Sequence, residues 1–413
     1  MSDPILKRIG NRSTIATLLA SLFCLSSGGA WAQGSLLTEA EAVGRGLARA
    51  EVNALLETRR QIAAGNTRAA GRWSNPEIEY SRESVDLPGG EGREKFLWIR
   101  QRLNVAGVHG LEREAAAALE VAAGARAEIE RRGIAADIRR LYYSALAAEA
   151  QLRTALRWQG RLDQLADSVS QRVAAGDASR YDLLRIEREF ALLRGEVLDR
   201  EAAAESARDR LFSLIGGQPA ALSGQVLPPA VAESAVADVV AEHPLLSALD
   251  AEADSASLSA RAAGRRTWPE VTVGVGRREV EEPGLDANGN LVMLGLEVPL
   301  FDRGDGEEFA AESRARRLDA ERRMAANRLT AETRAAVRAV EAGREAAQLL
   351  QAADAEEHSL ASIAESAYAA GEIGVMELID AHRADLAAQR EAIERAQSAR
   401  ESFIELQFLR GEP

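Results

Sequence analysis

Residues 172–184 read RVAAGDASRYDLL, and residues 367–379, which lie 195 positions later, read AYAAGEIGVMELI. Each stretch places Ala-Ala-Gly between two runs of helix-forming residues, which predicts two helices joined by a tight turn at Gly176 or Gly371. The same shift aligns LFSLIG at 211–216 with LQFLRG at 406–411. Self-similarity of this kind indicates an internal duplication, so we expect two halves with one common fold.

The positions of the prolines predict very long helices. None of the 11 prolines lies between Pro88 and Pro219, or between Pro299 and Pro413. Proline disrupts helix interiors, and both gaps are rich in Ala, Glu, Arg and Leu, which favour helices. The expected helices cover about 36–72, 107–174 and 179–215 in the first half, and about 239–267, 304–370 and 373–410 in the second. A helix of 107–174 would be about 100 Å long at 1.5 Å per residue.

Four short segments have the alternation of β-strands, at 76–85, 94–103, 269–278 and 291–300. Val271, Val273 and Val275, for example, share one face of the third segment. Turn-rich sequences at 86–92 and 283–290 join the segments into two hairpins. Each segment has roughly ten residues, the length of a tilted transmembrane strand. Four strands cannot close a barrel alone, so strands that cross a membrane would require several chains.

Composition excludes several classes of function. The net charge of −13 argues against a nucleic-acid-binding protein, which needs a basic face. The mean hydropathy of −0.20 excludes a protein with many membrane-spanning helices. Four histidines and one cysteine are too few for a metal cluster, and no hydrolase, nucleotide-binding or metalloprotease motif is present. We therefore expect no enzyme activity, catalytic residue, cofactor or metal site.

The N-terminus has the pattern of a secretory signal peptide. Lys7, Arg8 and Arg12 precede an apolar stretch at 15–25, and Ala30-Trp31-Ala32 forms a small-x-small cleavage site. We expect residues 1–32 to be removed, together with Cys24, the only cysteine. The mature chain would then be exported without disulfides.

The chain resembles TolC-type outer-membrane efflux proteins over essentially its whole mature length. The resemblance is carried by the hairpins after Pro76 and Pro269 and by the two turn-to-helix motifs quoted above. The start Asn75-Pro76-Glu77-Ile78 and the compact length point to the cobalt–zinc–cadmium efflux branch.

The resemblance implies a mainly α fold with a transmembrane β-barrel. Three identical chains would form a 12-stranded barrel and a helical periplasmic tunnel in the outer membrane of a Gram-negative bacterium. Each chain would contain a first repeat at 33–216, a linker at 217–238 in a belt around the tunnel, and a second repeat at 239–411. The implied partners are outer-membrane lipid, a periplasmic adapter protein and an inner-membrane RND-type pump, with heavy-metal cations as one possible cargo.

The same resemblance assigns roles to residues near the turns. Glu377 and Asp380 match the acidic pair at the tunnel entrance, although their spacing also fits an ordinary solvated helix face. Asp182 is the equivalent of Glu377, and Arg185 replaces the second acid, where it would pair with Asp182 or another acid and hold the entrance shut.

The residues expected to contact the adapter lie at the two turns. They are Gly176, Asp177, Ser179, Gly371, Glu372 and Val375. We expect the histidines at 109, 243, 358 and 382 to be scattered over the surface. Trp98 fits either an aromatic belt or ordinary packing.

Two other functions remain compatible with long helices. A periplasmic adapter also has helical hairpins, but usually one, together with compact β-domains. A secreted coiled-coil protein would leave the four strands without a purpose.

Overall fold

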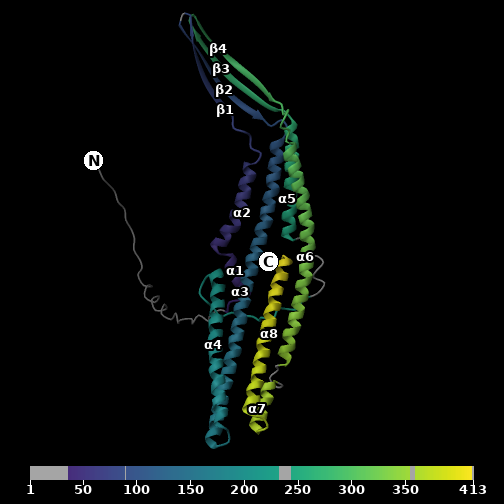
Figure 1. Cartoon of the computed structure of the whole chain (residues 1–413). Helices are drawn as coiled ribbons and strands as arrows, with labels where there is room; N and C mark the ends of the chain where they lie inside the picture. Colours follow the sequence, from purple (N-terminus) through teal and green to yellow (C-terminus); the bar gives the residue numbers. More distant parts are fainter. Residues whose placement is uncertain (1–35, 89, 232–242, 354–358, 412–413) are drawn as a thin grey trace, which may run out of the picture.

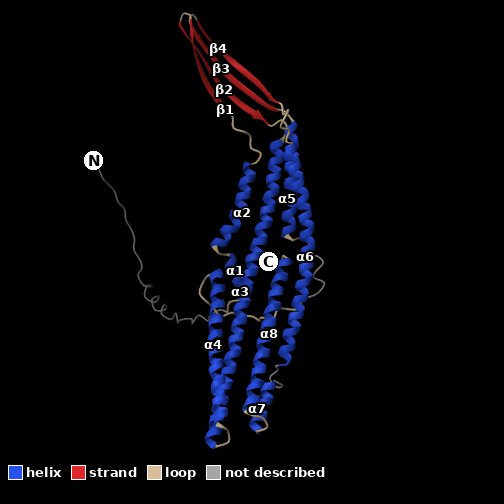
Figure 2. Ribbon diagram, in the orientation of Figure 1, coloured by secondary structure: helices blue, strands red, loops and turns tan. Residues whose placement is uncertain are grey.

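A computed structural model describes residues 36–88, 90–231, 243–353 and 359–411 of the chain (Figure 1). The expected signal peptide and cleavage site lie outside these residues. Long helices run side by side along most of the molecule, and a four-stranded sheet extends from one end (Figure 2). Among the helices of the described residues, none is long and apolar enough to cross a membrane.

In both halves a helical segment leads into a β-hairpin, which is followed by long helices and a final helix after a glycine turn, and this agrees with the duplication. The first half consists of α1 (Glu39–Leu47), α2 (Ala50–Ala69), β1 (Glu77–Leu87), β2 (Gly90–Leu103), α3 (Val108–Ala175) and α4 (Arg180–Ile215). The second consists of α5 (Pro244–Gly264), η2 (Arg265–Thr267), β3 (Glu270–Glu282), β4 (Leu285–Glu297), α6 (Asp305–Ala353), α7 (Leu360–Ala370) and α8 (Val375–Leu409). Helix α3 has 68 residues, as the absence of proline predicts.

The expected single helix at 36–72 is wrong, because the chain breaks between α1 and α2. Arg49 there has extended backbone angles, with φ −62° and ψ 141°. Its Nη1 donates hydrogen bonds to the carbonyl oxygens of Ser213, at 2.8 Å, and Leu214, at 3.0 Å. These carbonyls belong to the last turn of α4, where no intrahelical donor is left for them. The break therefore lets Arg49 cap a neighbouring helix.

The expected single helix at 304–370 is also wrong. Helix α6 ends at Ala353, and α7 begins only at Leu360. Ser359 has extended backbone angles, and its hydroxyl accepts a hydrogen bond from the amide of Ser362 at 3.1 Å. A serine in this position is a favourable helix N-cap, so a new helix starts here.

The strands form one antiparallel sheet in the order β1-β2-β3-β4. Strand β2 pairs with β3, from Arg93 opposite Glu281 to Leu103 opposite Val271, so the sheet joins the two halves. The pairing of β1 with β2 reaches Leu87 opposite Gly90, and that of β3 with β4 reaches Glu282 opposite Leu285, which are again 195 positions apart. All four strands are therefore present and extend further into the predicted turns than expected, whereas β4 ends at Glu297 and not at residue 300 as predicted. Strands β1 and β4 are the two edges.

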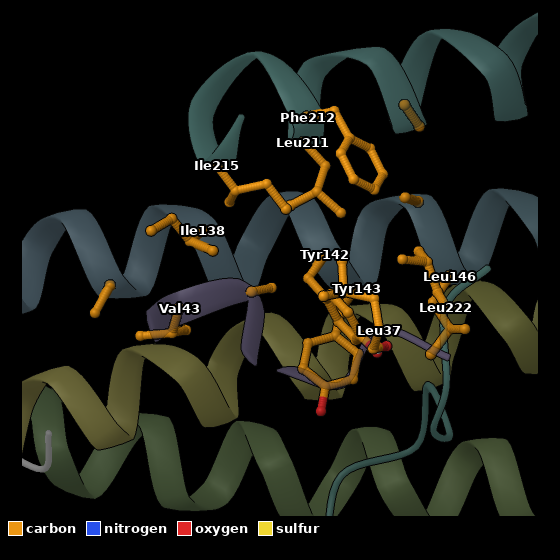
Figure 3. Close-up of a cluster of buried hydrophobic side chains, with 14 of the residues drawn as sticks. Leu37, Val43, Ile138, Tyr142, Tyr143, Leu146, Leu211, Phe212, Ile215 and Leu222 are labelled. Atoms are coloured by element: carbon orange, nitrogen blue, oxygen red, sulfur yellow. The ribbon is translucent and has the colours of Figure 1, made fainter. Parts of the chain in front are cut away.

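The largest hydrophobic cluster lies at mid-height, where α1, α3 and α4 meet (Figure 3). Tyr142 is fully buried there, and its hydroxyl donates to the carbonyl oxygen of Leu37 at 2.7 Å. The same hydroxyl accepts a hydrogen bond from the amide of Ser223 at 3.1 Å. The residues directly before α1 and the inter-repeat segment are thus fixed to α3 at one point.

Arg400 of α8 holds the inter-repeat segment from the other side. Its guanidinium is buried and donates to the carbonyl oxygens of Gln225 (2.9 Å), Val226 (2.9 Å) and Leu227 (2.7 Å). It also lies 4.0 Å from the centre of the Tyr143 ring. Residues 217–231 of the predicted linker therefore cross the bundle between α3 and α8, and residues 232–238 lie outside the described part.

Candidate functional site

The two Ala-Ala-Gly turns lie together at the end of the molecule opposite the sheet (Figure 1). Gly176 has φ 88° and Gly371 has φ 76°, in the left-handed region that favours glycine. The amide of Asp177 donates to the carbonyl of Arg172 at 2.8 Å, and that of Glu372 to the carbonyl of Ala367 at 2.9 Å. The predicted left-handed turns are confirmed, with the same geometry in both halves.

Most of the predicted tip residues are exposed. Gly176, Asp177, Ser179, Gly371 and Glu372 all lie at the surface. Val375, in contrast, is buried in a cluster that also contains Ile186, Ile379 and Leu386. Its side chain is therefore not available to a partner in this protomer, and it helps to pack the first turn of α8 against α4.

Asp182 and Ser179 together cap the N-terminus of α4. The carboxylate of Asp182 accepts hydrogen bonds from the amide and the hydroxyl of Ser179, at 3.2 and 2.8 Å, and the amide of Asp182 donates to that hydroxyl at 3.2 Å. This capping box satisfies donors that a helix start leaves unpaired. Within the described residues Asp182 forms no ion pair with Arg185, whose Nε is buried without a hydrogen-bond partner. One of the two pairings considered for Arg185 is therefore not formed.

Glu377 and Asp380 are both exposed near the start of α8. Asp380 lies 3.9 Å from Nη1 of Arg383, one turn further along the helix. Arg383 also donates from Nε to Oε1 of Glu189 on α4 at 2.8 Å, and this carboxylate is only 8% exposed. The hydrogen bond that Arg383 donates to Glu189 raises the pKa of Arg383. The acidic pair therefore borders a partly buried ion pair between the two helical hairpins.

A second ion pair joins the same helices one heptad further from the tips. Arg390 of α8 contacts Glu196 of α4, seven residues after Arg383 and Glu189 respectively. A shift of seven residues keeps a side chain on nearly the same face of a helix, so both pairs lie along one seam. The sequence reasoning missed all four residues, although their matched heptad spacing was a signal.

Two of the histidines are buried, so the prediction of surface histidines is wrong for them. His382 is 5% exposed, stacks on Trp158 with ring centres 4.3 Å apart, and places Nε2 3.1 Å from Oε1 of Glu365. Burial lowers the pKa of His382, and Glu365 opposes this shift. His243 is also buried and caps α5 through the Leu245 amide. His358 lies outside the described residues.

No group of three or more metal-ligating side chains occurs in the described part of the chain. The region around the two Ala-Ala-Gly turns thus contains exposed acids, a glycine turn in each half and ion pairs between the hairpins. Such a region can attract cations through its charge.

Residues 235–412 match the sequence model of the family described as outer membrane efflux protein. A curated relative, the cobalt-zinc-cadmium resistance protein CzcC of Cupriavidus metallidurans, is 29% identical over 213 residues. This match covers 50% of the chain and 49% of the relative, so it spans about half the length of each protein.

Solved structures match over nearly the whole chain. The outer-membrane channel OprN has a TM-score of 0.76 at 18% identity, covering 91% of this chain and 90% of that one. CusC, described as forming a transmembrane channel, has a TM-score of 0.77 at 16% identity, covering 91% and 92%. The outer membrane protein VceC of Vibrio cholerae has 0.71 at 17%, covering 90% and 96%. The chain thus resembles outer membrane efflux proteins in the sequence of its second half, and it has the fold of these solved structures over nearly its whole length.

Proposed function

We propose that three copies of this chain form an exit duct in the outer membrane, as part of a tripartite export system. The observation that carries this proposal is the sheet, which ends on two unpaired edges, β1 and β4, at one end of the long helices. An open edge inside a lipid layer would leave backbone donors and acceptors unsatisfied. Pairing β4 of each copy with β1 of the next removes every edge and gives 12 strands.

The helices supply the periplasmic part of the duct. Helix α3 alone has 68 residues, which corresponds to about 100 Å. The turns at Gly176 and Gly371 then lie far from the membrane, where a periplasmic adapter and an inner-membrane RND-type pump would meet the duct. A buried apolar cluster from α3, α4 and α8, with the Arg383–Glu189 pair, would hold each copy together at this end.

Outer-membrane assembly can be tested by fractionation. The mature protein should sediment with outer membranes and run as a detergent-stable trimer. A monomer released with the periplasmic contents would contradict the proposal and would favour a soluble adapter or coiled-coil protein.

We further propose divalent heavy-metal cations as cargo. The support is the relative described as a cobalt-zinc-cadmium resistance protein and the exposed Glu377 and Asp380 near the tips. A cation duct needs weak, distributed attraction rather than a tight site, and exposed carboxylates provide this. Deleting the gene should lower growth tolerance to cobalt, zinc and cadmium, and a plasmid copy should restore it. Unchanged metal tolerance with lost tolerance to organic compounds would identify organic molecules as the cargo instead.

A further inference from the structure

The register of the sheet separates its side chains into two faces. We call the face that carries Ile99 the Ile99 face and the opposite one the Trp98 face. Ile99 lies in one row with Ile78, Val275 and Val292. The Val292 side chain is 86% exposed, so no described residue of the chain covers this end of the row.

The Ile99 face is apolar toward the helices. The next two rows in that direction contain Gln101, Val273 and Leu294, and then Leu103, Val271 and Leu296. After β4 the alternation continues with Val298 and Leu300, and both are exposed. Gln101 is therefore the only polar side chain among the strand residues in these three rows.

The same face changes character abruptly toward the hairpin turns. The row of Tyr80, Leu97, Arg277 and Asn290 is half polar. The following two rows contain Arg82, Lys95, Glu279 and Asn288, and then Ser84, Arg93, Glu281 and Asp286. These rows contain no apolar side chain, and Lys95 pairs with Glu281 at 2.7 Å. Transfer of charged side chains into hydrocarbon is energetically unfavourable, so these two rows of the sheet do not suit contact with lipid tails.

The Trp98 face differs at the height of the apolar rows. Arg100 there contacts Glu79 and lies 3.8 Å from Glu77. Trp98 covers Gly276, where an added Cβ would lie 2.8 Å from the indole. Charges and glycine dominate this face, so it suits a water-filled interior, and the Ile99 face is the one that suits lipid.

Aromatic side chains mark the helical end of the apolar rows. Trp73 and Trp268 lie 195 positions apart, just before β1 and β3, and are 64% and 63% exposed. Phe301 is also almost fully exposed. Tryptophan is enriched at membrane–water boundaries, where its amphipathic ring is stable. The repeat thus places one exposed tryptophan at the base of each hairpin.

The height of the apolar region agrees with a membrane. From Trp268, which has extended backbone angles, to Arg277 of β3 the chain advances about 30 Å at ~3.3 Å per residue, and a strand tilt of ~40° reduces this to about 23 Å. Apolar bands of outer-membrane barrels are about 25 Å tall. The hairpin ends beyond Tyr80 and Leu97 are therefore not needed to span the hydrocarbon.

We propose that lipid covers only the helical half of the Ile99 face, with Trp73 and Trp268 at the periplasmic boundary. The outer halves of both hairpins then project from the cell surface as a charged, water-exposed wall. This inference rests on the proposed outer-membrane location, and it adds where the membrane begins and ends on this chain.

Spin labels on three neighbouring positions of β4 test the boundary. The chain's one cysteine, Cys24, lies in the segment expected to be removed, so Asn288→Cys, Val292→Cys and Met293→Cys each give a single label. The protein is reconstituted in liposomes of phosphatidylethanolamine and phosphatidylglycerol. Relaxation by oxygen, which enriches in hydrocarbon, is compared with relaxation by a water-soluble nickel chelate.

We expect relaxation by oxygen to exceed relaxation by the nickel chelate for the label at position 292, and the reverse for the labels at positions 288 and 293. Position 293 is the matched control, since it lies at nearly the same height but on the Trp98 face. Oxygen dominance at 288 as well as 292 would overturn the boundary while leaving the membrane location intact. Nickel dominance at all three positions would overturn both the boundary and the membrane location.

Tryptophan fluorescence tests the other boundary. Lipids brominated close to the headgroup should quench part of the emission of the reconstituted protein. The double variant Trp73→Phe with Trp268→Phe should lose this quenched part, because Trp98 faces the interior and Trp158 is buried between helices. Quenching that persists undiminished in the double variant would contradict the assignment of these two tryptophans.

Discussion

Arg400 provides the sharpest test of how the two halves are held together. It is 6% exposed, and its guanidinium donates to three consecutive carbonyls of the inter-repeat segment. Within the described residues no carboxylate forms an ion pair with it, and burial lowers its pKa. The substitution Arg400→Met keeps most of the apolar stem and removes only the donors and the charge.

The structure sets the size of the expected effect. A hydrogen bond that involves a charged group contributes about 1.5–3 kcal/mol, and stacking on Tyr143 adds about 1 kcal/mol. The three bonds share one guanidinium whose burial is itself unfavourable, so their contributions do not add. We therefore expect Arg400→Met to lower the free energy of local opening of the inter-repeat segment by about 3 kcal/mol, which corresponds to roughly a hundredfold increase in the opening equilibrium constant.

Hydrogen exchange read by mass spectrometry can localise this loss. The amide of Ser223 donates to the carbonyl of Leu37 at 3.0 Å, and that of Leu37 donates to the carbonyl of Ala221 at 2.8 Å. Peptides covering these amides should exchange roughly a hundredfold faster in the variant. Peptides from the sheet should be unaffected.

Arg395→Met is the matched control, because Arg395 lies on the same helix and is mostly exposed in a pair with Glu391. Exposed ion pairs contribute little to stability, so we expect Arg395→Met to change the free energy of local opening by less than about 0.5 kcal/mol. Equal exchange rates in wild type and Arg400→Met would refute the view that Arg400 holds the inter-repeat segment. So would an increase of the same size in the control.

Three further predictions concern the tip region. Gly176→Val or Gly371→Val should weaken copurification of the adapter without affecting membrane insertion, because left-handed backbone angles are strained for a β-branched residue while the space around both glycines is open. Glu377→Gln with Asp380→Asn should reduce both cation selectivity and block by trivalent cations in planar bilayers, with the trimer retained; unchanged conductance behaviour would leave these acids as a solvated face. Burial lowers the pKa of His382 below its usual 6.5, so the stability that neutral His382 contributes should be complete above about pH 6.5 and decrease as the pH falls below that value. The variant His382→Gln should therefore show a smaller difference in Tm between pH 7.5 and pH 5.5 than the wild type. An equal difference would contradict this role.

Local sequence features predicted most of the fold because they act over short distances. The end of α3 was predicted within one residue, since Gly176 supplies the left-handed turn that a helix end needs. The strands continue further toward the hairpin turns than predicted, because the alternation of apolar residues stops near Arg82 and Arg277 while backbone pairing continues. At its other end β4 stops at Glu297, three residues before the predicted end. A strand segment made of charged residues lacks the apolar alternation by which a strand is recognised in a sequence.

Contacts between distant elements could not be predicted in the same way. The break at Arg49 depends on the end of α4, more than 160 residues away. The burial of His382 depends on Trp158, which lies on a different helix. In each case the residue's own neighbourhood in the sequence fits a surface helix, and only tertiary packing supplies the partner.

The central claim is that three chains close one barrel through their β1 and β4 edges. Electron cryomicroscopy of the mature protein, purified from outer membranes in detergent, tests it most directly. We expect a threefold particle in which β4 of each copy pairs with β1 of the next to form 12 continuous strands above a helical tunnel. A particle of another symmetry, or a monomer whose four-stranded sheet remains open, would contradict it.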